Sequence, residues 1–440
     1  MVYNVLPNIR SNQVRGGGGI TSYSKDSKGV TRKRFSQICA VLLLLLLLPA
    51  FLDTLPLELR SKALAGGMAG LQPGQPIFES ISPSDLSEPV ILRPDPAGRG
   101  TLRIQTSIIP ELQQYLVRKV EGNISPWVVI CCMDPVSGRV LAMAESDKEG
   151  SGIKLTTELL APAASIFKII TAAGAIEKCG FRPGASFCYN GRKHTLYKSQ
   201  LKDKKNRWTQ EVTLEEAFSE SINPVFGKIG VNCLKRQGLL ELAARFGWDR
   251  DIPFEWQVKR SRIKVGHHPY NWAEVSSGFN KETRITVLHG ALITAAVVND
   301  GVMMRPSFID SISNDRDGII YQSSFGPFLR PVSSRTAGWI QEMMKSTITR
   351  GTARRSFAGW KRDRILKNLV LGGKTGTIDS PDNKYRYDWF CGFAKEPESG
   401  RCLVVSALVV HHEVLGFKAA RLARMAIKRY FELLDSKRAE

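Results

Sequence analysis

The chain has 440 residues, more than one compact domain needs, so we expect one large globular body with attachments. Its 43% hydrophobic and 23% charged residues provide a sizeable core and exclude a disordered, collagenous or multi-pass membrane protein. The net charge of +21 attracts polyanions, but no nucleic-acid motif accompanies basic clusters such as Arg354-Arg355, which we interpret as solvated faces.

The N-terminal residues predict a membrane attachment. Residues 1–34 form a basic, polar tail whose composition cannot order itself. The chain then becomes apolar, with leucine at every position from Leu42 to Leu48, and residues 35–57 are just long enough for one transmembrane helix. The basic tail predicts a cytoplasmic N-terminus and export of everything that follows. A signal peptide cleaved near Ala63-Leu64-Ala65 is the alternative.

Residues 58–96 are rich in Pro, Gly and Ser and predict a spacer, followed by a compact domain over residues 97–440. Turn chemistry at Asp134-Pro135-Val136-Ser137-Gly138 predicts a hairpin. Hydrophobic periodicity predicts the other elements. We expect helices over Leu112 to Val120, Ile166 to Lys178 and Ala419 to Leu434, and strands over Trp127 to Met133, Arg139 to Ala144, Leu366 to Gly373 and Leu403 to Val410. This order predicts an α+β fold with an antiparallel β-sheet flanked by helices.

The eight cysteines contain no CxxC pair and no histidine at zinc-site spacing, so we expect no metal site. Cys179 and Cys188 bracket a short segment and would close a loop in an oxidising compartment. Free, half-buried thiols are the alternative, and the sequence leaves this pairing open.

The first candidate for chemistry is Ser165-Ile166-Phe167-Lys168, which opens an apolar helix. Positions i and i+3 share a helix face, so the hydroxyl and the amine can meet as nucleophile and base. Burial favours the neutral amine, and the helix N-terminus favours developing negative charge. An isolated Ser165 could equally be a helix N-cap. The same spacing recurs in polar surroundings, where a solvated loop explains it: Ser22/Lys25, Ser151/Lys154, Ser199/Lys202 and Ser261/Lys264.

Two further segments could serve the same site. Ser221-Ile222-Asn223 offers a hydroxyl and an amide from one turn, although both are ordinary turn residues. Lys374-Thr375-Gly376-Thr377 follows an apolar strand. Gly376 would let a ligand backbone lie beside that strand, while the lysine and the hydroxyls would grip a carboxylate. A strand end with a solvated lysine is the plainer account of this segment alone.

Together, in the order SxxK, SxN and KTG, these segments resemble the transpeptidase domain of penicillin-binding proteins over residues 101 to 434. Met133 to Met143 is similar to the family's first hairpin, Arg350-Gly351-Thr352-Ala353 precedes the KTG strand, and Asp388 to Ala394 resembles the strand after it. The resemblance implies a penicillin-binding/β-lactamase-like fold, in which an all-helical subdomain accompanies the sheet.

Two departures from the family pattern stand out. Pro162-Ala163-Ala164 precedes Ser165 where the family more often has Pro-Gly-Ser, which affects only the local loop. The short spacer leaves no room for a glycosyltransferase or large pedestal domain, so we expect a monofunctional enzyme.

The resemblance implies acyl transfer on peptidoglycan stem peptides that end in D-Ala-D-Ala. Ser165 would attack the carbonyl, Lys168 would take its proton, Ser221 would pass a proton towards the leaving amine and Asn223 would hold the substrate amide. The terminal carboxylate would bind Lys374, Thr375, Gly376 and Thr377. The N–H groups of Ser165 and Thr377 would form the oxyanion hole.

The resemblance also implies partners and a location. β-Lactams would acylate Ser165, and neither a cofactor nor a metal is required. The expected location is a bacterial inner (cytoplasmic) membrane, spanned once by residues 35–57, with the catalytic domain in the periplasm. Peptidoglycan and the proteins of a cell-wall synthesis complex are the expected partners, and nucleic acid is not.

Three alternatives remain open. A D,D-carboxypeptidase would use water as acceptor, a choice set by groove shape. A serine β-lactamase is disfavoured because no segment matches the deacylating glutamate of class A enzymes. A non-catalytic penicillin sensor or scaffold is disfavoured because residues 1–34 hold no visible signalling domain. The histidines show no ligand spacing and receive no catalytic role: His194, His267, His268, His289, His411 and His412.

Overall fold

The structure is a computed structural model that describes residues 76–96, 98 and 100–439. The expected tail (1–34), membrane segment (35–57) and first part of the spacer (58–75) lie outside the described residues. Among the residues that are described, no helix combines the length and the apolar character needed to cross a bilayer.

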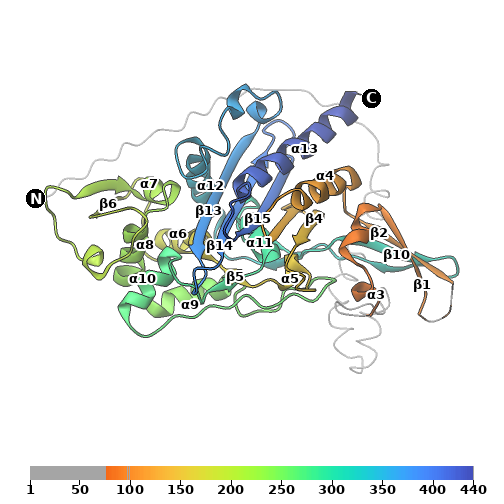
Figure 1. The fold of residues 1–440 in the computed structure, drawn as a ribbon, viewed down its shortest axis with the longest axis horizontal. Coiled ribbons are helices and arrows are strands. Elements are labelled where there is room, and N and C mark those ends of the chain that lie inside the picture. Colours follow the sequence, from red (N-terminus) through yellow and green to blue (C-terminus); the bar gives the residue numbers. More distant parts are fainter. Residues whose placement is uncertain (1–75, 97, 99, 440) are drawn as a thin grey trace, which may run out of the picture. The chain divides into compact units, whose positions relative to one another are not determined.

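A five-stranded antiparallel sheet in the order β13-β14-β15-β3-β4 forms the centre of the fold (Figure 1). All ten residues of β15 are buried, as expected for a strand covered on both faces. The predicted hairpin of β3 and β4 is confirmed, with a bulge between Cys132 and Met133. The strands are β13 (Val370–Asp379), β14 (Arg386–Lys395), β15 (Cys402–His411), β3 (Trp127–Met133) and β4 (Val140–Asp147).

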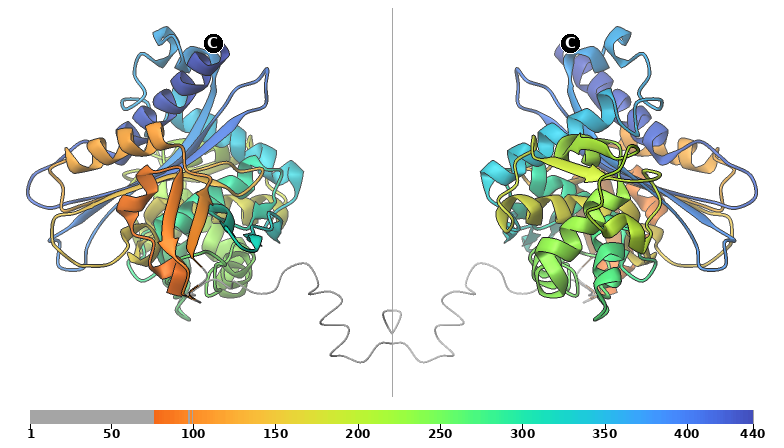
Figure 2. Two further views of the ribbon diagram at one scale, coloured as in Figure 1. Left: turned by 90° about the vertical axis from the view of Figure 1, so that its right-hand side faces the viewer. Right: turned by 90° about the vertical axis from the view of Figure 1, so that its left-hand side faces the viewer.

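Helices cover both faces of this sheet. Alternation along β3 sends Val128 and Ile130 into a core shared with α4 (Pro110–Glu121) and α13 (Ala419–Ala439). Figure 2 shows these two helices on one side of the sheet. Val129 belongs to the larger core of the opposite face, to which α11 (Val287–Val298) and α12 (Ser334–Thr349) contribute. The predicted α+β class is confirmed.

A helical part accompanies the sheet, and it carries a disulfide. Cys179, just after α6 (Lys168–Glu177), pairs with Cys233 in the π-helical turn η4 (Gly230–Leu234), with a Cα–Cα distance of 6.1 Å. Pairing of Cys179 with Cys188 is therefore wrong, and Cys188 carries a free thiol. The helical part also contains α7 (Leu214–Ser219), α8 (Asn223–Ile229), α9 (Lys235–Arg245), α10 (Pro269–Ser277), η3 (Lys198–Leu201) and the paired strands β6 (Ser186–Tyr189) and β7 (Gln210–Thr213).

The compact region begins before the expected boundary at residue 97. Residues 76–96, assigned to the spacer from their composition, form α3 (Pro76–Glu79), η1 (Pro83–Ser87) and β1 (Val90–Pro94). Apolar side chains between the prolines enter the core, and Phe78 is fully buried. β1 is the edge of a second sheet in the order β1-β2-β10-β11. Its other strands are β2 (Thr101–Thr106), β10 (Ile309–Asn314) and β11 (Gly318–Gln322).

The strand predicted over Leu366 to Gly373 starts late, at Val370. The carboxylate of Asp363 accepts the N–H groups of Ile365 and Leu366 at 3.0 and 3.3 Å, which stabilises a turn before the strand. The remaining short elements are α5 (Leu155–Glu158), β5 (Ala161–Pro162), η2 (Ala164–Phe167), β8 (Arg284–Ile285), β9 (Met303–Met304), β12 (Pro327–Leu329), η5 (Trp360–Arg362) and η6 (Leu366–Asn368).

A buried carboxyl group ties the segment after α9 to the start of β10. Glu255 accepts hydrogen bonds from the Ser307 hydroxyl and from the N–H groups of Phe308 and Ile309 at 3.3 and 3.4 Å. Burial raises the pKa of Glu255 from 4.5 to about 7. Between these values the folded state binds more protons than the unfolded state, so the free energy of unfolding falls as pH rises.

We therefore expect Glu255 to lower the free energy of unfolding by about 3 kcal/mol between pH 4.5 and pH 7. Glu255→Gln removes the titrating group, so this part of the pH dependence should disappear. Urea unfolding of both proteins across this pH range measures the two slopes. Equal slopes would contradict the assignment.

Candidate active site

Ser165 stands on a tightly constrained turn. It belongs to η2, which leads directly into α6, and it lines a cleft of about 1320 Å³. Ala164 has a positive φ of 47°, and Gly278, at φ 68°, packs against it so closely that a Cβ on Gly278 would lie 2.0 Å from the Ala164 carbonyl oxygen. Trp389 of β14 donates its indole N–H to the Pro162 carbonyl at 2.9 Å. These contacts hold the backbone of the turn that carries Ser165.

Lys168 is fully buried beneath Ser165, with its Nζ 2.8 Å from Ser165 Oγ. The Nζ also donates to Asn223 Oδ1 at 2.7 Å and to the Ser277 carbonyl at 2.5 Å. Burial, and next the positive charge of Lys374, hold the pKa of Lys168 well below its usual value. A neutral amine has two N–H groups, both taken here by carbonyl oxygens, so its lone pair is left for the Ser165 hydroxyl.

Ser221, between α7 and α8, and Asn223, the first residue of α8, flank this pair. Ser221 adopts the left-handed conformation, with φ 58°, which turns its Oγ to within 3.0 Å of Lys374 Nζ. Asn223 donates from Nδ2 to the His194 carbonyl at 2.9 Å, while its Oδ1 accepts from Lys168. Both ends of the Asn223 amide are thus engaged within the protein, and this side chain positions Lys168.

The segment from Lys374 to Thr377 lies on β13. Lys374 is fully buried, and burial lowers its pKa to about 7. Thr375 and Thr377 line the cleft, so their hydroxyls are the part of this segment that a bound carboxylate would meet. A Cβ on Gly376 would lie 3.3 Å from the Ser165 nitrogen, so this glycine lets β13 approach the Ser165 turn.

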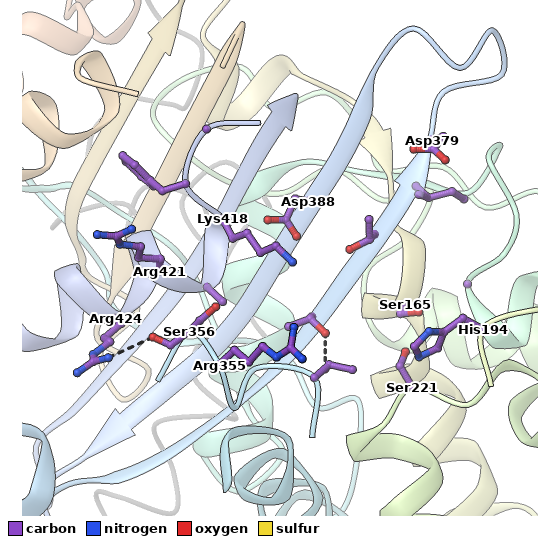
Figure 3. Close-up of a pocket in the computed structure, with 18 of the residues that line it drawn as sticks. Ser165, His194, Ser221, Arg355, Ser356, Asp379, Asp388, Lys418, Arg421 and Arg424 are labelled. Atoms are coloured by element: carbon purple, nitrogen blue, oxygen red, sulfur yellow. Dashed lines mark hydrogen bonds between the residues drawn. The ribbon is translucent and has the colours of Figure 1, made fainter. Parts of the chain in front are cut away.

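Asn223 is held in place by two backbone carbonyls that the sequence does not predict as part of the site. We call these contacts with Lys193 and His194 the clamp. The Asn223 N–H donates to the Lys193 carbonyl at 2.7 Å, next to the bond that the Asn223 side chain makes to the His194 carbonyl. The His194 ring lies 3.0 Å from the Glu220 carbonyl, and Lys193 forms an ion pair with the Glu220 carboxylate. Figure 3 shows the His194 ring beside Ser221 at the cleft. No sequence motif around His194 predicts this arrangement, because it depends on contacts between residues that are distant in sequence.

The structure therefore brings together every site residue that the sequence predicted, from three separate segments. A nucleophilic hydroxyl, a base with a lowered pKa and a second hydroxyl next to a second lysine form a site equipped for acyl transfer.

Comparisons with known proteins show which family the chain resembles. Residues 128–427 match the family model described as penicillin binding protein transpeptidase domain. The peptidoglycan D,D-transpeptidase PbpA of Mycolicibacterium smegmatis is 24% identical over 352 residues, which are 72% of this chain and 68% of that protein.

Solved structures share the fold. The D,D-transpeptidase domain of a peptidoglycan glycosyltransferase from Eggerthella lenta superposes with a TM-score of 0.64 at 22% identity, over 77% of this chain and 84% of that one. The penicillin G acyl-enzyme complex of penicillin-binding protein A from Mycobacterium tuberculosis gives a TM-score of 0.58 at 21% identity, over 74% and 80% of the two chains.

The fold and the Ser165–Lys168 pair define a serine-type transpeptidase. The chain belongs to the family of penicillin-binding protein transpeptidase domains.

Proposed function

We propose that this protein is a peptidoglycan D,D-transpeptidase that forms an acyl-enzyme on Ser165 from stem peptides ending in D-Ala-D-Ala. The observation that carries the proposal is the buried Lys168 amine, whose lone pair is free for the Ser165 hydroxyl 2.8 Å away. The name of the Mycolicibacterium smegmatis relative and the acyl-enzyme of the Mycobacterium tuberculosis protein support the reaction and its inhibition by β-lactams.

The reaction begins when Ser165 Oγ attacks the carbonyl carbon of the penultimate D-Ala and its proton passes to Lys168 Nζ. The N–H groups of Ser165 and Thr377 stabilise the resulting oxyanion, and the hydroxyls of Thr375 and Thr377 bind the terminal carboxylate. Ser221 passes its proton to the leaving amine and takes one from Lys374 Nζ, 3.0 Å away, and the C–N bond breaks to release D-Ala. The amine of a second stem peptide then attacks the ester and forms the cross-link. Its proton passes through Ser221 to Lys374, while Lys168 returns a proton to Ser165 Oγ.

Export across a bacterial inner membrane, with residues 35–57 as anchor, is part of this proposal. The Cys179–Cys233 disulfide supports an oxidising, extracytoplasmic location for the catalytic domain.

The test is incubation of the purified full-length protein with a D-Ala-D-Ala donor and an amine-bearing acceptor peptide. We expect a cross-linked product that forms in step with the release of D-Ala. Release of D-Ala without cross-link would identify a carboxypeptidase, and covalent penicillin binding without either product would identify a sensor or scaffold. Both results would overturn the proposal.

The contact between Gly278 and the Ser165 turn gives a separate prediction. Gly278→Ala places a methyl group 2.0 Å from the Ala164 carbonyl oxygen, so the turn must move. Because catalytic geometry tolerates little displacement, we expect acylation by a fluorescent penicillin to slow by about 100-fold. Gly184→Ala is the matched control, since no atom lies within 4 Å of the added Cβ. Equal acylation rates in the two variants would contradict the prediction.

A further inference from the structure

The catalytic cleft extends beyond Ser165 along a stretch that is lined by positively charged side chains. We call it the basic arm and define it by Arg355, Lys418, Arg421, Arg424 and Lys428, which line the same cleft as Ser165 and Ser221. Figure 3 shows Arg355 between Ser221 and the side chains of Lys418 and Arg421. The whole cleft is lined by six lysines and arginines but only two aspartates.

Two of the five cations already have protein partners. Arg424 donates to the carbonyls of Ser356 and Ala358 at 3.3 and 2.8 Å. Lys428 forms an ion pair with Asp363 at 2.8 Å. The other three, Arg355, Lys418 and Arg421, are exposed, and their side chains make no hydrogen bond or ion pair with any residue that the structure describes.

The acidic residues of the cleft do not balance this charge. Asp379 is paired with Arg386 at 2.7 Å, and Asp388 accepts the N–H of Ala419 at 3.0 Å. Lys418 precedes α13 and Arg421 lies in its first turn, where the helix dipole disfavours cations. Arg355 comes from a different segment, after α12. Three cations without ion pairs thus come from two segments to a cleft in which, of the residues that the structure describes, Asp388 is the one carboxylate left without an arginine or lysine partner.

We propose that the basic arm binds the carboxylates of the second stem peptide, the acceptor of the cross-link. This inference rests on the proposed function and names the acceptor class. In the proposed reaction the donor carboxylate is held by Thr375 and Thr377, which leaves the arm vacant for another anion. The acceptor must enter this same cleft to bring its amine to the Ser165 ester. Guanidinium groups bind carboxylates through charge-assisted, often bidentate hydrogen bonds.

The test compares two synthetic acceptor tetrapeptides that differ only in their carboxyl groups, which are free in one and amidated in the other. We expect the wild-type protein to use the free form at least about tenfold better in kcat/KM for the acceptor. In Arg355→Ala/Arg421→Ala this preference should fall to about twofold or less, because kcat/KM for the free form drops. Arg103→Ala/Arg250→Ala removes two exposed arginines outside the cleft and should keep the full preference.

Equal use of the two peptides by the wild-type protein would overturn the inference, as would an equal loss of preference in the two double variants. Binding of each peptide to full-length protein, measured by calorimetry, gives the same comparison without turnover. Failure of the proposed function would look different, because neither peptide would then be cross-linked by the wild-type protein or by any variant. Tighter binding of a polyphosphate chain than of either peptide would assign the arm to another polyanion and overturn the inference.

Discussion

Ser165→Ala is expected to abolish covalent labelling of the full-length protein by a fluorescent penicillin, with a loss of at least about 10³-fold in acylation rate. The reason is chemical. The substitution removes the oxygen that forms the ester. The other hydroxyl beside a lysine, Ser221 at 3.0 Å from Lys374, passes protons in the proposed reaction and does not attack the carbonyl. Gel-resolved labelling over time measures the loss.

The matched control is Ser199→Ala, because Ser199 and Lys202 repeat the same serine-to-lysine spacing on an exposed segment. Labelling of this variant should equal that of the wild-type protein. Thermal unfolding of both variants separates loss of chemistry from loss of fold. Persistent labelling of a folded Ser165→Ala protein would contradict the assignment of the nucleophile.

Lys168→Met should slow acylation by about 10²- to 10⁴-fold, the usual contribution of a positioned general base. Methionine retains an apolar chain of similar length, and replacing a fully buried amine in this way should not unfold the protein. The acylation rate is measured against penicillin concentration for both proteins. A folded variant that acylates within threefold of wild type would contradict the role of Lys168.

The pH dependence tests the cause of the low Lys168 pKa. Lys168 accepts a proton only when neutral, so the acylation rate should rise with pH, and it should do so well below pH 10.5. The charge of Lys374 lowers the Lys168 pKa, so Lys374→Met should move the rise to higher pH, whatever its effect on the maximal rate. An unmoved or lowered midpoint would contradict this coupling.

Local patterns were sufficient to predict much of the site. The other serine-lysine pairs show why the apolar helix after Ser165, and not the spacing alone, identified the catalytic pair. Ser151 bonds to Asp147 at 2.6 Å, while Lys154 bonds to Glu79 at 2.9 Å. Ser261 bonds to His289 at 2.7 Å. Ser151, Lys154, Ser261 and Lys264 thus each have a partner outside their pair, and Lys264 bonds to Glu282. At Ser165 the apolar helix instead keeps the serine and the fully buried lysine together.

Features that depend on distant contacts could not be predicted. The disulfide joins residues that are 54 positions apart, and no spacing rule distinguishes Cys233 from Cys188 as the partner of Cys179. The clamp at Lys193 and His194 consists mainly of backbone carbonyls, which carry no sequence signature. The Phe78 ring packs against Tyr321 of β11, a contact distant in sequence that composition does not reveal, so composition assigned this segment to a spacer.

The most direct test of the acyl-enzyme is mass spectrometry of the full-length protein after reaction with penicillin G. We expect one adduct with the mass of the whole inhibitor, and peptide mapping should place it on Ser165, beside Lys168. An adduct on any other residue, or none on folded protein, would contradict the assignment of Ser165 as the acylated nucleophile.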